Sequence, residues 1–229
     1  MLINNKISTS VHKCFSKTWY GKEIISVCKY FIGKDLFHTK MGMDIKGSVR
    51  IRKFICGGGN FMRVGKGSLL NRVDVIVIGN NNSISIGENC LIGKNCKLYL
   101  EGNNMSLTIG NGCTFSHDDE LLLQEDDSRI SIGDNCMFSH HINVRTSDSH
   151  PIYDIDSGHR VNEAKDVNIG NHVWVTPCCI IQKGVSIGNG SIIATSSIVT
   201  KDIPQNCVAA GMPAKVVKQN VTWSKFFNE

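Results

Sequence analysis

Histidine is the residue type in this 229-residue chain that could most directly do chemistry. A neutral imidazole can accept a proton near pH 7 or bind a metal ion through a ring nitrogen. His150 opens a long stretch without pattern, in the run Asp-Ser-His-Pro, whereas His117 and His140 each follow a phenylalanine by two residues. The other five histidines are His12, His38, His141, His159 and His172, of which only His141 and His172 adjoin patterned positions. Which of these imidazoles can act together depends on the elements that carry them.

A six-residue period in the C-terminal half decides the fold class. Its aliphatic positions are Ile169, Val175, Ile181, Ile187, Ile193 and Val199. Six is not the helical period of 3.6, and a strand of thirty residues would far exceed the usual strand length. A chain that turns a corner after each short strand keeps these residues on one side, and three such sides close a triangle of eighteen residues. The sequence therefore predicts an all-β protein folded as a parallel β-helix.

A second, wider spacing precedes this region. Three sets of large apolar residues repeat with a pitch of 23 residues: Ile86/Ile92/Leu98, Ile109/Phe115/Leu121 and Ile132/Phe138/Val144. The five residues added to each coil fall at one place, so small loops protrude from the same corner. The next interruption is much longer and covers residues 145–166, and long loops on rigid scaffolds usually serve function. Because His117 and His140 are also 23 residues apart, we expect their rings to stack ~5 Å apart on successive coils.

Ten cysteines raise the question of disulfides or metal sites. Cys90, Cys96, Cys113, Cys136 and Cys179 each lie four positions after an apolar residue of the repeat, where valine or serine stands elsewhere. We therefore expect these thiols to act as small buried hydrophobes. Reduced thiols are consistent with a cytoplasmic protein.

The net charge of +5 is unevenly distributed along the chain. Residues 1–66 contain 13 basic and 3 acidic residues, whereas residues 67–229 contain 12 basic and 17 acidic ones. A basic N-terminal third could contact anionic lipid, an acidic polysaccharide or nucleic acid, and a solvated surface explains it as well. No signal-peptide core and no apolar run of membrane-spanning length is present, so we expect a cytoplasmic protein. We expect no nucleic-acid partner.

Residues 1–43 do not follow the repeat. Ile24, Ile25, Cys28, Phe31 and Ile32 have the spacing of one face of an amphipathic helix. Such a helix would cap the open end of the solenoid, and the alternative is a peripheral helix on the inner face of the membrane. The predicted domains are a capping segment at 1–43, a β-helix at 44–203 with a loop at 145–166, and a C-terminal tail at 204–229.

Four runs near the C-terminus carry a resemblance to a known family. They are Ile169-Gly-Asn-His-Val-Trp174, Ile187-Gly-Asn-Gly-Ser-Ile-Ile193, Val199-Thr-Lys-Asp-Ile-Pro204 and Ala210-Gly-Met-Pro-Ala-Lys215. Residues 132–218 thereby resemble the hexapeptide-repeat acyltransferases, which implies a left-handed parallel β-helix. The pair His150-Pro151, 24 residues before Trp174, is most similar to that of the capsule and O-antigen O-acetyltransferases, the polysialic-acid O-acetyltransferases among them.

The resemblance implies that His150 and Trp174 are the catalytic residues. A sugar hydroxyl is a poor nucleophile until its proton leaves, and a neutral imidazole is suited to accept that proton. Asp148 or a carbonyl group could hold the required tautomer. A backbone N–H or the indole N–H of Trp174 would stabilise the oxyanion, although Trp174 could instead be only a bulky corner residue.

The resemblance also implies the ligands. Acetyl-CoA is expected in a groove between two subunits of a homotrimer, against Thr195, Thr200, Lys201, Lys215 and Lys218, and no metal is expected. Lysine can meet a phosphate as a point charge. For a saccharide acceptor, we expect contacts from His117, Asp118, Arg145 and Arg160.

The predicted function is therefore transfer of an acetyl group from acetyl-CoA to a hydroxyl of a bacterial surface polysaccharide, in a capsule or an O-antigen. One alternative is an N-acetyltransferase acting on a nucleotide-linked amino sugar. Another is a zinc lyase of the γ-carbonic-anhydrase kind, with His117 and His140 among its ligands. A third is a scaffold protein without catalysis.

Overall fold

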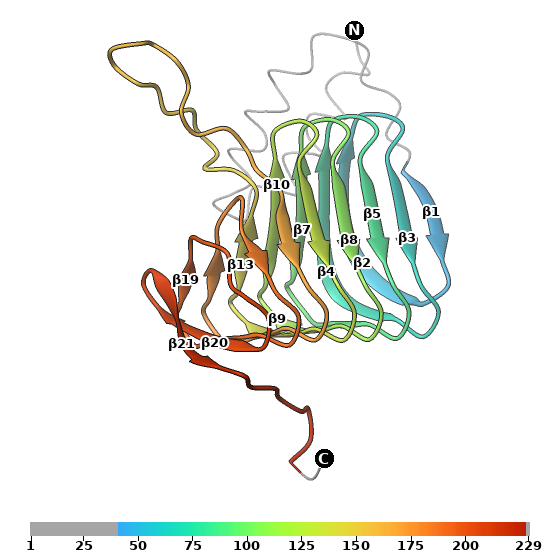
Figure 1. Ribbon diagram of the computed structural model, residues 1–229. Coiled ribbons are helices and arrows are strands. Elements are labelled where there is room, and N and C mark those ends of the chain that lie inside the picture. Colours follow the sequence, from blue (N-terminus) through green and yellow to red (C-terminus); the bar gives the residue numbers. More distant parts are fainter. Residues whose placement is uncertain (1–40, 228–229) are drawn as a thin grey trace, which may run out of the picture. The chain divides into compact units, whose positions relative to one another are not determined.

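The structure is a computed structural model, and it describes residues 41–227 (Figure 1). The predicted helix at residues 24–32, with its capping or membrane role, lies outside the described residues. Within residues 41–227 the helices and strands assigned are all β-strands, joined by turns and loops, as the six-residue period predicted. This part of the chain contains no helix long and apolar enough to cross a membrane.

The described chain winds as a parallel β-helix with three faces, as predicted (Figure 1). The first face is a seven-stranded sheet of β1 (Gly42–Ile45), β3 (Phe61–Val64), β5 (Ser83–Ile86), β8 (Ser106–Ile109), β11 (Arg129–Ile132), β14 (Val167–Ile169) and β17 (Ser186–Ile187). The second and third faces share one larger sheet, because β2 (Ser48–Cys56) and β4 (Leu69–Ile78) run around the corner between them.

The remaining strands complete these two faces. The second face continues with β6 (Leu91–Ile92), β9 (Thr114–His117), β12 (Met137–His140), β15 (Trp174–Val175), β18 (Ile192–Ile193) and β20 (Cys207–Gly211). The third face continues with β7 (Lys97–Glu101), β10 (Glu120–Gln124), β13 (Asn143–Arg145), β16 (Ile180–Ile181) and β19 (Ile198–Val199). We call the first-to-second, second-to-third and third-to-first turns the first, second and third corners.

The core is a set of columns of like residues along the prism. Ile109 pairs in register with Ile132, and Ile132 with Ile169, and all three side chains are buried. On the second face the rings of Phe115 and Phe138 stack with centroids 4.3 Å apart. Alternation along each short strand places one side chain inside and the next outside, so the period of six becomes a continuous apolar interior.

Tight corners allow the coils to stack. At the second corner a single residue with φ between 56° and 62° turns the chain in six successive coils, namely Arg72, Asn95, Asp118, His141, Cys178 and Ser196. At the third corner Gly79 has a φ of 124°, and a Cβ there would lie 1.9 Å from the carbonyl oxygen of Gly102 in the next coil. Glycine is required where the backbone of one coil approaches the next so closely.

The five cysteines of the repeat are buried, as predicted. All eight cysteines in the described residues are free thiols. Burial is the main cause that raises the pKa of Cys96, to about 12, so this thiol stays protonated and behaves as a small hydrophobe.

The periodic region extends past residue 203, where the tail was predicted to begin. Ile203 is buried and forms a parallel bridge with Ile187 on the first face. β20 then pairs in parallel with β18, and β21 (Ala214–Gln219) returns antiparallel to β20. The C-terminal run therefore closes the end of the prism with a hairpin instead of leaving it.

One inward position of the core is occupied by a carboxyl group. Asp119 is only 2% exposed and accepts a hydrogen bond from the backbone N–H of Ile142 at 2.9 Å. Burial raises the pKa of Asp119 to about 7, and the neighbouring Asp118 charge adds to this, against the opposing effects of that hydrogen bond and of His117. Desolvation therefore outweighs the hydrogen bond that favours the charged form.

We expect Asp119 to make folding pH-dependent. Its folded pKa is raised above the unfolded value near 3.9, so the native state binds more protons between about pH 4 and pH 7. Stability should then fall as pH rises through that window, by at most about 1.4 kcal/mol per pH unit, and change no further above it. Urea unfolding of the wild type and of Asp119→Asn at several pH values measures the difference. A free-energy difference between the two proteins that is independent of pH would contradict this assignment.

Candidate active site

His150 lies on the loop that joins β13 to β14 at the third corner. The loop extends away from the prism, as the gold segment of Figure 1 shows. Its outer part folds back on itself through an antiparallel bridge between Tyr153 and Arg160. Its tip is exposed, and the exposed fraction reaches 98% at Ile155. The His150 side chain is also exposed, so its imidazole is free to meet a ligand.

Asn162 holds the main chain on both sides of His150. This residue is buried, and its Nδ2 donates to the backbone oxygen of His150 at 2.8 Å and to Oδ2 of Asp148 at 2.9 Å. Its Oδ1 accepts from the backbone N–H of Ile152 at 2.6 Å and from Nε of Arg160 at 3.2 Å. Asn162 is not among the predicted site residues, because the loop has no period that would identify it.

Asp148 was a candidate to hold the tautomer of His150, and the structure gives it different partners. Its Oδ2 lies 2.7 Å from Nζ of Lys183 on the next coil, which also donates to the backbone oxygen of Asn162 at 2.6 Å. The Lys183 contact is the main cause that lowers the pKa of Asp148. Asp148 therefore stays ionised and ties the start of the loop to the prism.

The side chain of Arg160 is likewise held by contacts that fix the loop. Its guanidinium forms a two-pronged ion pair with the Glu125 carboxylate, with both N···O distances at 2.7 Å. Ser147 donates to the same carboxylate at 2.5 Å, and the Arg160 hydrogen bond is the main cause that lowers the pKa of Glu125. Fork-to-carboxylate pairs are geometrically specific, so this pair fixes the loop's return. The acceptor contact predicted for Arg160 stays a prediction.

Trp174 begins β15, just after the first corner. Its Nε1 is buried and has no hydrogen-bond partner in the described part of the chain. Trp223, from the C-terminal segment, packs beside it with ring centroids 5.8 Å apart and stacks on His172 at 4.2 Å. Trp223 Nε1 donates to the backbone oxygen of His172, and a ring nitrogen of His172 lies 2.9 Å from the backbone oxygen of Trp223.

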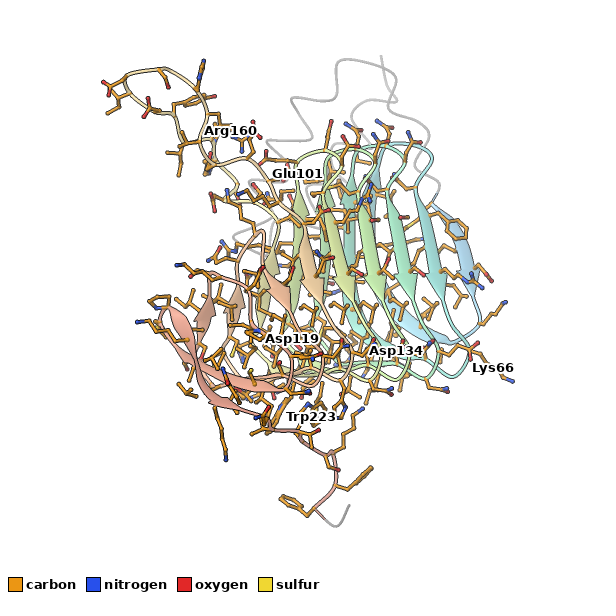
Figure 2. All side chains as sticks on the ribbon, viewed as in Figure 1. Lys66, Glu101, Asp119, Asp134, Arg160 and Trp223 are labelled. Atoms are coloured by element: carbon orange, nitrogen blue, oxygen red, sulfur yellow. The ribbon has the colours of Figure 1, made fainter. Side chains whose placement is uncertain are left out.

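The described chain does not bring His150 and Trp174 together. His150 belongs to the third corner, whereas Trp174 follows the first corner, with all of β14 between them. Figure 2 shows the two regions on opposite sides of the view, with Arg160 of the loop at the top and Trp223 at the bottom. One chain therefore presents the two predicted catalytic residues on different edges.

The predicted cofactor residues lie at the C-terminal end of the prism. Thr195 is at the second corner, where its Oγ1 donates to Oγ1 of the buried Thr176 at 3.2 Å. The others follow β19 or lie on β21, and all are exposed: Thr200, Lys201, Lys215 and Lys218.

Two predicted acceptor residues are in contact. A ring nitrogen of His117, Nδ1, lies 2.6 Å from Oδ2 of Asp118. The rings of His117 and His140 stack with centroids 5.0 Å apart and an interplanar angle of 3°, which confirms the predicted stacking on successive coils. Arg145 is elsewhere, on the third face beside the loop, where its Nε donates to Oδ1 of Asn143 at 2.7 Å.

Arg145 lies at one end of a row of polar side chains, and the other members of this row are not among the predicted site residues. Asn143 donates to Glu120 at 3.0 Å, and Glu120 forms an ion pair with Lys97. Lys97, Glu120 and Asn143 are in register on the third face. Their positions differ by 23 residues, so the pitch found in the sequence could have identified this row.

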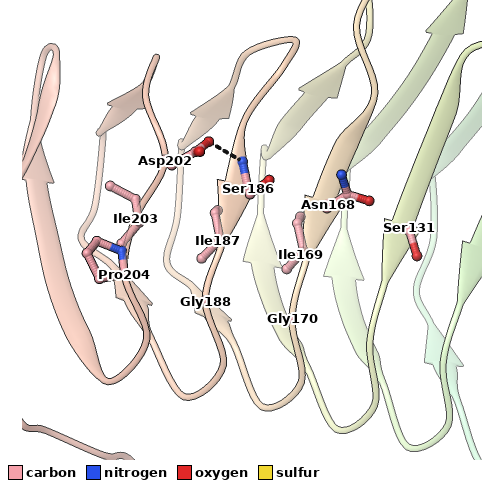
Figure 3. A pocket seen from close by; sticks show the side chains of 10 residues that line it. All are labelled: Ser131, Asn168, Ile169, Gly170, Ser186, Ile187, Gly188, Asp202, Ile203 and Pro204. Atoms are coloured by element: carbon pink, nitrogen blue, oxygen red, sulfur yellow. Dashed lines mark hydrogen bonds between the residues drawn. The ribbon is translucent and has the colours of Figure 1, made fainter.

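A shallow hollow of about 420 Å³ lies elsewhere, on the first face (Figure 3). Its lining includes Asn168, Ser186 and Asp202, and Asp202 accepts the backbone N–H of Ser186 at 2.7 Å. None of the predicted site residues lines it.

No protein-family model matches the sequence. Among curated proteins, a polysialic acid O-acetyltransferase from Neisseria meningitidis is 38% identical over 188 residues, which cover 74% of this chain and 87% of that protein. A polysialic acid O-acetyltransferase from Escherichia coli O1:K1 / APEC is 45% identical over 82 residues, but this alignment spans only 36% of this chain and 27% of that protein.

Solved structures agree with the sequence relatives. The crystal structure of NeuO, described as a polysialic acid-specific acetyltransferase, superposes with a TM-score of 0.60 at 33% identity and covers 82% of this chain and 91% of that one. Together with the prism and its C-terminal runs, these relationships show that the chain belongs to the hexapeptide-repeat acetyltransferases.

Proposed function

We propose that this protein transfers the acetyl group of acetyl-CoA to a hydroxyl of a bacterial surface polysaccharide, with His150 as the general base. The observation that carries the proposal is an exposed imidazole on a loop whose main chain is clamped on both sides by Asn162. The Neisseria meningitidis relative, which aligns over most of both chains, is an O-acetyltransferase by name, and this favours a hydroxyl over an amine acceptor.

The chemistry requires one proton acceptor and one oxyanion donor. The His150 imidazole takes the proton of the sugar hydroxyl as its oxygen attacks the thioester carbonyl. The new C–O bond forms, the C–S bond breaks, and the imidazolium returns the proton to the departing thiolate of CoA. The Trp174 indole N–H is suited to the oxyanion, because it is a buried donor with no partner among the described residues.

We infer that the site is shared between subunits. His150 and Trp174 lie on different edges of one prism, so one chain alone cannot place both beside the same thioester. A homotrimer would set the protruding loop of one subunit against the second face of its neighbour. The exposed apolar side chains of Ile152, Tyr153 and Ile155 on the loop support such a contact.

The remaining residues suit the two substrates. Lys201, Lys215 and Lys218 are exposed near the end of the prism and offer positive charge to the phosphates of acetyl-CoA. Arg145 and Lys97 belong to the polar row on the third face, which begins beside the loop and supplies hydrogen bonds for a sugar polymer. His117 and Asp118 remain candidate acceptor contacts.

Replacing His150 with alanine should lower the rate of acetyl transfer about 10²–10⁴-fold, because the base is removed. Labelled acetyl-CoA, a panel of bacterial glycans that includes polysialic acid, and mass spectrometry of the products measure the rate and the acceptor. Acetyl-CoA affinity and the thermal unfolding midpoint should be unchanged, and His159→Ala on the same loop is the matched control. A fully active His150→Ala protein would overturn the assignment of the base.

Mixed assemblies test the shared site. His150→Ala and Trp174→Ala proteins should each be impaired, but a trimer containing both chains can combine the histidine of one with the tryptophan of the other. Co-expression with two different tags and tandem purification isolates the mixed species. Each mixed trimer has one intact interface out of three, so about one third of the wild-type activity should return. Mixed trimers as inactive as their parents would place the site within one chain.

Replacing Asn162 with leucine should lower kcat about 10–100-fold with little change in KM for acetyl-CoA, because the main chain at His150 loses its support. The loop tip offers a control, Asp154→Ala, which removes hydrogen bonds to Ser157 that are remote from His150. Steady-state kinetics and circular dichroism separate a positioning effect from misfolding. Wild-type kcat in a folded Asn162→Leu protein would remove Asn162 from the mechanism.

A further inference from the structure

Four titratable side chains meet at the second corner of two successive coils. We call His117, Asp118, His140 and His141 the histidine corner. The three imidazole rings form one cluster: His141 lies edge-on to both stacked rings, with centroids 5.8 Å from His117 and 5.1 Å from His140. The register of β9 with β12 places them one coil apart.

The fold itself does not require histidine at these positions. The same corner is turned with the same positive φ by Asn95 in the preceding coil and by Cys178 in the following one. Residues as different as arginine and serine serve in other coils. The gathering of three imidazoles and a carboxylate is therefore a property of the side chains, not of the backbone turn.

Asp118 orients the first ring. Its Oδ2 lies 2.6 Å from Nδ1 of His117, and its Oδ1 accepts from Nδ2 of Asn95 at 3.1 Å. These contacts hold the His117 ring and the Asp118 carboxylate side by side, so both are placed to face the same ion.

The rings of His140 and His141 contact each other through their Nδ1 atoms. Nδ1 of His140 and Nδ1 of His141 are 2.9 Å apart. At this distance one nitrogen must donate and the other must accept, because two facing N–H groups would repel. One Nδ1 therefore uses its lone pair to accept this hydrogen bond, so the contact must open before that nitrogen can bind a metal ion.

The distances suit a small cation after a modest adjustment. Single ligand atoms of His117, Asp118 and His141 all lie within 4.8 Å of one another. Tetrahedral zinc with bonds of about 2.0–2.1 Å needs ligand atoms roughly 3.3–3.5 Å apart. His117 and Asp118 are half-buried and are held together by their mutual contact. His141 is exposed, so its side chain has room to rotate toward them.

We propose that the histidine corner binds a divalent transition-metal ion of the zinc class, with His117, Asp118 and His141 as ligands and His140 beside them. Imidazole with a carboxylate is a donor set that selects such ions over magnesium or calcium. Within one chain the site is separate from His150, which lies on the loop at the third corner. It joins two coils, so the ion would cross-link the prism where its polar corner faces solvent.

Zinc binding to the untagged, metal-free, full-length protein tests the proposal. Isothermal titration should show one Zn²⁺ per chain, and Co²⁺ should give the visible absorption of a low-symmetry, four- or five-coordinate site. His141→Ala and His117→Ala should each weaken Zn²⁺ binding at least tenfold. His159→Ala, an exposed histidine of the loop, is the control and should bind as the wild type does.

The outcome does not depend on the proposed acetyl transfer, because binding is the readout. His141 is exposed, so His141→Ala should fold, and circular dichroism checks this. Absence of Zn²⁺ binding to the wild type would overturn the proposal. Undiminished binding by a folded His117→Ala/His141→Ala protein would also overturn it, because the ion would then lie elsewhere.

Discussion

Parallel pairing of each coil with the next is the constraint on which this structure depends. Each short strand satisfies its backbone groups only through the coils before and after it, as the in-register pairs of Ile109, Ile132 and Ile169 illustrate. At the second corner the turns must therefore be nearly identical from coil to coil, whereas the third corner admits extra residues such as the loop at 145–166. Single residues in the left-handed conformation at the second corner meet this requirement, since a longer connection would break the register.

The stacking of coils also explains why side chains of the same type line up along the prism. Residues one pitch apart face the same way, so like side chains accumulate along the prism: phenylalanines in the core, imidazoles at the second corner and a polar row on the third face. The same rule places Asp119 among apolar neighbours, because its position in the coil is an inward one. The position of a residue within the coil decides whether its side chain is buried or exposed, whatever the residue type.

The conformation of the loop after β13 is determined by its own hydrogen bonds and ion pairs, because the loop does not follow the repeat. Buried Asn162 is fully hydrogen-bonded, and a buried polar group that loses its partners is costly. The ion pairs of Asp148 with Lys183 and of Arg160 with Glu125 are partly exposed, so each contributes modest stability and acts chiefly by fixing geometry. The main chain at His150 is therefore positioned more by the buried side-chain amide of Asn162 than by the ion pairs of the loop.

The sequence by itself determined what a period can report. Six-residue spacing predicted the three-sided coil and the inward cysteines, and the 23-residue pitch predicted the stacked pair of His117 and His140, because alternation and pitch depend on residue number alone. Residues of the loop have no period, so only the tertiary structure decided that Asp148 pairs with Lys183 and that Asn162 supports His150. It also decided that His150 and Trp174 lie on different edges, since the distance between two corners follows from how the chain closes in space.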